Sequence, residues 1–152
     1  MKGMLVAIPF ALAACGGSNS GSGGSTGTTN PNNFLGTAWN GSVNTTVTCP
    51  GAPAQSQPNT YQVGFSQASD ADFQYTSGSG CTYKFKVSGN TASLSNSPVS
   101  CSSTVSGVTV TATWTSYTLT TSDGHNLAIS AAGNASASGT TCPFSQTGTA
   151  TR

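Results

Sequence analysis

Two pairs of titratable residues in this sequence have types and spacings that could do chemistry. Asp123 and His125 flank Gly124, and together with an abundant serine they suggest the acid, base and nucleophile of a minimal hydrolase. An Asp-Gly pair is typical of a turn, so we interpret Asp123 as a turn residue and His125 as the exposed start of a strand. Asp70 and Asp72 could hold calcium, but they lack the spacing of a calcium loop and fit a solvated turn. We therefore expect no enzyme activity and no metal site.

Four cysteines in the C-terminal part of the chain suggest a different chemistry. Cys49, Cys81, Cys101 and Cys142 form an even set with no Cys-x-x-Cys spacing, and His125 is far in sequence from all of them. This pattern does not favour zinc. In an exported protein it predicts two disulfides, for which three connectivities exist.

The N-terminal residues predict export. Met1-Lys2 is a short positive start, and residues 3–14 are uncharged and mostly apolar. A helix of twelve residues spans roughly 18 Å, too short for a hydrocarbon core about 30 Å thick, so we interpret residues 1–14 as a signal peptide.

Leu12-Ala13-Ala14-Cys15 resembles the lipobox of bacterial lipoproteins. The resemblance implies a diacylglycerol thioether on Cys15, cleavage before this residue and often a fatty acyl chain on the new amino terminus. Such chains would be the only attached groups, with no other cofactor expected, and they would anchor the protein in membrane lipid. The alternative is an ordinary signal peptide cut at an Ala-x-Ala-like site, with Cys15 as a spare thiol. Cys15 would also be the odd member of the five cysteines.

The composition divides the rest of the chain into a tether and a domain. Residues 15–33 are the lipidated Cys and a linker rich in Gly, Ser and Thr without a large apolar side chain, and residues 34–152 are a disulfide-stapled β domain. Gly16 is not the Asp that retains enterobacterial lipoproteins in the inner membrane. The resemblance thus favours the bacterial cell envelope, at the outer membrane. Only 5% of the residues are charged, which is too few for a nucleic-acid surface.

Alternating apolar residues predict an all-β domain of about eight short strands. The prolines of residues 50–59 are expected to interrupt the pattern. The expected strands are residues 37–48, 61–65, 73–75, 81–87, a short return strand after Gly89-Asn90, 108–120, a strand around 127–129, and 141–150.

Two turns and one bulge fix the expected register. A two-residue loop at Gly89-Asn90 places Val87 opposite Ala92. A three-residue loop at 122–124, with Gly124 in the left-handed conformation, places Leu119 opposite Leu127. The apolar residues change parity between Trp114 and Leu119, which predicts a bulge near Thr115-Ser116.

An antiparallel meander of this kind predicts a small up-and-down barrel, with a β-sandwich as the alternative. In a barrel the first and last strands are neighbours, which favours a Cys49–Cys142 disulfide, and the hairpin brings Cys81 near Cys101. Gly36-Thr37-Ala38-Trp39 also resembles the Gly-x-Trp of lipocalins and avidins, with one extra residue.

The aromatic residues are numerous enough to fill such a barrel, and this is their expected use. If the interior holds a ligand instead, Trp39 and Trp114 are the first candidates. The sequence therefore predicts an envelope lipoprotein with a non-catalytic domain for binding or envelope structure. The alternatives are a carrier of a small hydrophobic ligand, a domain that stacks a glycan on an exposed aromatic ring, and the minimal hydrolase at His125.

Overall fold

The computed structural model describes residues 30–152, which form nine β-strands and one short 3₁₀ helix. Among these residues, no helix has the length and apolar character needed to cross a bilayer. The elements are η1 (Pro31–Asn33), β1 (Trp39–Val47), β2 (Gln55–Val63), β3 (Phe73–Thr76), β4 (Thr82–Ser88), β5 (Thr91–Leu94), β6 (Val99–Val105), β7 (Val108–Thr120), β8 (Asn126–Ala137) and β9 (Thr140–Thr151).

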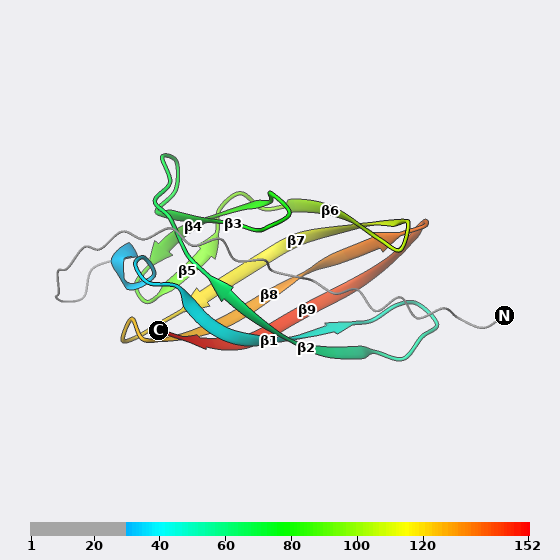
Figure 1. Cartoon of the computed structure of the whole chain (residues 1–152), viewed down its shortest axis with the longest axis horizontal. Coiled ribbons are helices and arrows are strands. Elements are labelled where there is room, and N and C mark those ends of the chain that lie inside the picture. Colours follow the sequence, from blue (N-terminus) through cyan, green and yellow to red (C-terminus); the bar gives the residue numbers. More distant parts are fainter. Residues whose placement is uncertain (1–29) are drawn as a thin grey trace.

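The strands form one antiparallel sheet that curls into a half-barrel (Figure 1). Its order is β2-β1-β9-β8-β7-β5-β4-β3. On the same side of β7, β6 pairs with the first half of this strand and β5 with the second half. This is the cyclic order of an up-and-down meander, opened between β2 and β3. The all-β antiparallel architecture expected from the alternating residues is confirmed.

The edges β2 and β3 meet at one point. Just after β2, Ser66 pairs with Gln74 of β3 through two backbone hydrogen bonds of 2.9 and 2.8 Å. Phe65, beside this bridge, packs its ring 5.0 Å from that of Phe73. We call the line between β2 and β3 the seam; among residues 30–152 the Ser66–Gln74 bridge is the only strand pairing across it.

One end of the half-barrel is sealed by the segment around η1. Phe34 stacks on Phe73 at 5.1 Å, and its carbonyl oxygen accepts a 3.0 Å hydrogen bond from Trp39 Nε1. The Arg152 guanidinium lies 4.4 Å from the centroid of the Trp39 ring. It donates hydrogen bonds to the carbonyl oxygens of Leu35, Asn33 and Gly124. These contacts fix the largest aromatic side chains at this end.

Several registers agree with the sequence analysis. The Gly89-Asn90 hairpin sets Val87 opposite Ala92, as expected. The register of β7 against β8 shifts between Trp114 and Ser116, which confirms the predicted bulge. β1 pairs with β9, so the first and last strands are neighbours.

Three local predictions were wrong. β2 begins at Gln55, within the stretch that was expected to interrupt the strands. Its Pro58 is tolerated because β2 is an edge strand, which has a neighbouring strand on one side only. β6 was not predicted, since its central residues are hydroxyl-bearing and exposed. The turn after β7 is longer than three residues, and Leu119 lies opposite Ile129 instead of Leu127.

Both disulfides have the connectivity that the strand order favours. Cys49 is joined to Cys142, which connects the chain just after β1 to β9. Cys81 is joined to Cys101, which connects the start of β4 to β6. The first bond thus reinforces the β1–β9 pair, and the second joins β4 to β6, two strands that do not pair with each other in the backbone ladder.

Candidate functional site

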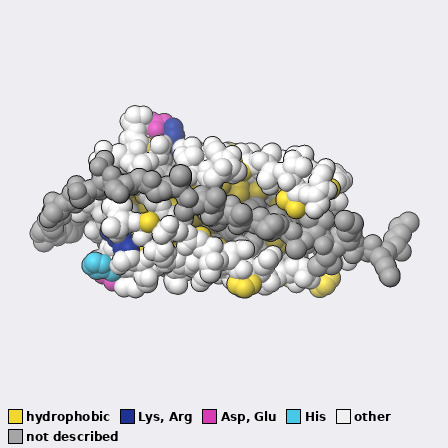
Figure 2. Space-filling model, viewed as in Figure 1, with side chains coloured by type: hydrophobic (Ala, Val, Ile, Leu, Met, Phe, Trp, Pro, Cys, Tyr) yellow, Lys and Arg dark blue, Asp and Glu magenta, His cyan; other side chains and the backbone are white. Residues whose placement is uncertain are grey.

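The concave face of the half-barrel changes from large to small side chains along its length. At the sealed end it carries Trp39, Phe73 and Phe85, each 0% exposed. Towards the other end the inward positions of β7 and β8 carry Ala112 and Ala135. Figure 2, in the same view as Figure 1, shows hydrophobic side chains along the middle of the molecule, between the row of β3, β4 and β6 and the row of β1 and β2. Hydrophobic side chains thus reach the surface on this side of the sheet.

Four tyrosines from four strands gather in this interior. Tyr75 of β3 stacks on Tyr83 of β4 at 5.7 Å, and Tyr83 contacts the Tyr117 ring of β7 edge-on at 5.8 Å. Tyr61 comes from β2, across the seam. Burial raises the pKa of Tyr117, and the neighbouring phenols of Tyr61, Tyr75 and Tyr83 raise it further, so all four phenols share one low-dielectric region.

Two of these phenols have no hydrogen-bond partner among the described residues. The hydroxyl oxygens of Tyr61 and Tyr75 are both buried and unpaired. Burial raises the pKa of Tyr75 to about 12 and raises that of Tyr61 as well, so both groups are neutral donors at physiological pH. A buried hydroxyl without a partner costs about 1 to 3 kcal/mol. Their alternation with polar residues predicts both side chains in the core and gives no sign of the unpaired hydroxyls.

Two other polar groups of the interior have partners. Gln146 Nε2 donates to Thr45 Oγ1 at 3.0 Å across the β9–β1 pair. The hydroxyl of Tyr83 lies 3.4 Å from Cys101 Sγ. Among the described residues, the buried side-chain polar atoms without a partner are thus the hydroxyl oxygens of Tyr61 and Tyr75, one on each edge strand.

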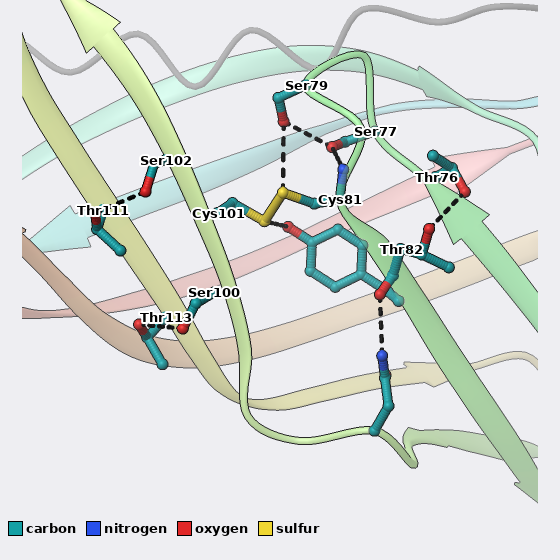
Figure 3. The surroundings of a disulfide bond; sticks show 12 residues. Thr76, Ser77, Ser79, Cys81, Thr82, Ser100, Cys101, Ser102, Thr111 and Thr113 are labelled. Carbon is teal, nitrogen blue, oxygen red and sulfur yellow. Dashed lines mark hydrogen bonds between the residues drawn. A yellow bond between two sulfur atoms is a disulfide. The ribbon is translucent and has the colours of Figure 1, made fainter.

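The Cys81–Cys101 disulfide holds the β4 side of this cluster in place. Figure 3 shows Ser79 above the bond, where its hydroxyl donates to Cys81 Sγ at 3.8 Å. Beside it, hydroxyl pairs between β6 and β7 join Ser100 to Thr113 and Ser102 to Thr111 at 2.9 and 2.8 Å. The disulfide and these pairs tie β4 and β6 to β7, and β4 carries Tyr83.

The two tryptophans proposed as ligand residues lie in different regions. Trp39 is fully buried at the sealed end and its indole N–H is bonded to Phe34. Trp114 packs edge-on against Tyr83 at 5.4 Å and against Phe144 at 5.3 Å. Trp114 therefore borders the tyrosine cluster, whereas Trp39 belongs to the packing of the sealed end.

The carboxylates are committed to loop structure. Asp70 pairs with Lys84 at 2.6 Å, and Asp72 accepts a 2.6 Å hydrogen bond from the backbone N–H of Val87. In the part of the chain that the structure describes, no three His, Cys, Asp or Glu side chains come together as metal ligands.

Asp123 organises the turn between β7 and β8. Its carboxylate accepts hydrogen bonds from the backbone N–H groups of His125 and Asn126, both at 2.8 Å, and from Asn126 Nδ2 at 2.6 Å. Thr121 Oγ1 accepts from the backbone N–H of Gly124, which has a φ of 70°. These side-chain hydrogen bonds stabilise a turn that is longer than the three-residue loop predicted from Gly124. The hydrogen bonds also hold the pKa of Asp123 well below its ordinary value.

Asp123→Asn is expected to weaken the acid sensitivity of the fold. Because the folded-state pKa is depressed, Asp123 adds stability above the unfolded-state pKa of about 4, and this stability is lost as the pH falls towards the folded-state value. The thermal midpoint should therefore fall less between pH 5 and pH 2 in the variant than in the parent. Ser122→Ala, an exposed neighbour in the same turn, should retain the parental pH dependence. Equal pH profiles for Asp123→Asn and the parent would contradict the assignment.

Cys15 and its lipobox lie outside the described residues. Comparison with protein-family models, with curated proteins and with solved structures finds no match for this chain.

Proposed function

We propose that this chain is a bacterial envelope lipoprotein, anchored in membrane lipid through Cys15, whose β domain binds a partner or ligand without catalysis. The pairing of the cysteines carries this proposal. The two disulfides use all four cysteines of the domain, so that Cys15 is the odd one of five. Two disulfides are typical of an oxidising compartment outside the cytoplasm, which agrees with an exported protein.

The arrangement of the titratable groups supports the non-catalytic part of the proposal. Asp123 accepts four hydrogen bonds from the turn that it stabilises, and none of these comes from the imidazole of His125. Asp70 and Asp72 are paired with lysines of β4. A general acid or base works best with a pKa near the operating pH, whereas the pKa values of Asp123 and Asp70 are lowered, away from that range.

The anchor is tested by growing a Gram-negative host that expresses the full chain with an alkyne-bearing palmitate analogue. We expect the parent protein to carry the label and to sediment with membranes. Cys15→Ala should lose the label completely and leave the membrane fraction, whereas Ser18→Ala, in the neighbouring linker, should behave like the parent. A labelled Cys15→Ala protein, or an unlabelled parent, would overturn the proposed anchor.

A carrier of a small hydrophobic ligand is the second candidate function. It is favoured by the unpaired phenols of Tyr61 and Tyr75 and by the small side chains on the concave face. In this version the acyl chains keep the carrier at the membrane surface, where apolar molecules are concentrated.

A further inference from the structure

The fold does not explain the buried hydroxyl groups of Tyr61 and Tyr75. The two side chains are only 8% and 5% exposed, and neither hydroxyl has a hydrogen-bond partner among residues 30–152. Buried polar groups in native proteins nearly always have a partner, because desolvation without one destabilises the fold. Both exceptions face the same interior, which suggests that the partner is a bound molecule.

The position of the two residues shows where such a molecule would enter. Tyr61 lies on β2 and Tyr75 on β3, the two edges of the sheet. Tyr75 follows directly after Gln74, whose bridge to Ser66 is the strand pairing across the seam. A ligand between the edges would therefore meet one phenol from each side.

We propose that the seam between β2 and β3 binds a neutral, largely apolar small molecule with a carbonyl or ether oxygen, to which Tyr61 and Tyr75 donate hydrogen bonds. This inference rests on the carrier function proposed above and assigns its chemical class of ligand. The rings of Tyr75, Tyr83 and Trp114 supply the apolar surroundings. The phenols supply the donors, which fits a ligand with an acceptor oxygen.

The distribution of charge favours a neutral ligand. Among the described residues, Lys84 and Lys86 pair with Asp70 and Asp72, and Arg152 is bonded to three carbonyl oxygens at the sealed end. No cation of the described chain is thus placed to compensate a buried carboxylate or phosphate. An uncompensated buried charge is far more costly than a buried ketone, ester or ether.

The test uses 6-propionyl-2-(dimethylamino)naphthalene, a neutral aromatic ketone whose emission shifts to shorter wavelength in apolar surroundings. The protein is the full chain with Cys15→Ala, so that no acyl chain competes for the probe. We expect a saturable shift with one site per chain. Tyr61→Phe and Tyr75→Phe keep the ring and remove the donor, and each should weaken binding about ten-fold.

Tyr83→Phe is the matched control, because its hydroxyl already contacts Cys101 Sγ and its ring belongs to the same cluster. It should change the affinity less than about two-fold. The Tyr61 and Tyr75 variants should also melt at or above the parental temperature, since each loses an unpaired buried hydroxyl. An anionic probe, 8-anilinonaphthalene-1-sulfonate, should bind at least about ten-fold more weakly than the ketone.

The outcomes separate this inference from the broader proposal. Saturable binding that is unchanged in both Tyr→Phe variants, or equally weakened in Tyr83→Phe, would overturn the role of the two phenols and leave a carrier intact. Stronger binding of the anionic probe would overturn the neutral ligand class. The absence of saturable binding to either probe would overturn both the seam site and the carrier function, while the acylation of Cys15 is tested independently.

Discussion

Replacing Cys49 and Cys142 together by alanine is expected to lower the free energy of unfolding by roughly 4 to 5 kcal/mol. The bond joins residues 93 apart in sequence, so its loss greatly increases the conformational entropy of the unfolded chain. It also connects the chain after β1 to β9, the first and last strands of the meander. Urea unfolding followed by near-ultraviolet circular dichroism measures the change. A domain of this size has about 5 to 15 kcal/mol of stability, so the loss is a large fraction of the total.

The Cys81–Cys101 disulfide provides the comparison for this prediction. Its residues are separated by 20 positions, and the double alanine variant should lose about 3 kcal/mol. The order of the two losses follows from loop length. A loss at Cys81–Cys101 equal to or greater than that at Cys49–Cys142 would contradict the entropic explanation and show that local packing around β6 dominates.

Local patterns in the sequence predicted the parts of the fold that depend on neighbouring residues. The hairpin at Gly89-Asn90 follows from turn chemistry, and the register of Val87 against Ala92 follows from the hairpin. The bulge after Trp114 follows because the apolar residues change from even to odd positions within one strand. Only an extra residue keeps both sets on the same face of the sheet. These features need no knowledge of the rest of the chain.

The wrong predictions concern residues whose conformation depends on side-chain hydrogen bonds or distant strands. Ser102 and Thr111 pair their hydroxyls across β6 and β7, but a run of Ser and Thr has no apolar alternation to mark a strand. The turn after β7 is lengthened because Asp123 and Thr121 bind backbone N–H groups within it. Neither interaction has a distinctive spacing in sequence.

The candidate site could not be predicted because its defining property is a missing contact. Tyr61 and Tyr75 have the alternation of ordinary core residues, and their rings are buried as expected. That their hydroxyls lack partners depends on where the sheet opens, and the sequence predicted a closed barrel without locating a seam. The predicted neighbour Trp114 does border the cluster, through its contact with Tyr83.

Neighbouring strands approach closely at several glycines of the sheet, where a side chain would clash. A Cβ atom at Gly133 of β8 would lie 2.1 Å from the Thr113 carbonyl oxygen and 2.8 Å from Phe144 Cζ. Gly133 pairs with Trp114 on one side and with Phe144 on the other, so both aromatic rings cover the space above it. The glycine thus lets the β7 backbone and the Phe144 ring of β9 lie close to the β8 backbone.

Gly133→Ala is therefore expected to destabilise the domain by about 3 kcal/mol, because the clash involves backbone atoms that no rotamer change relieves. Gly64→Ala is the matched control: a Cβ atom there meets nothing within 4 Å, and its effect should stay within about 1 kcal/mol, on the stabilising side. Urea unfolding of both variants measures the difference. Because Gly133 lies below Trp114, the alanine variant should also move this ring, which near-ultraviolet circular dichroism of the folded protein would detect. Equal stability of the two variants would show that β7 and β8 separate without cost, which would contradict a requirement for glycine at position 133.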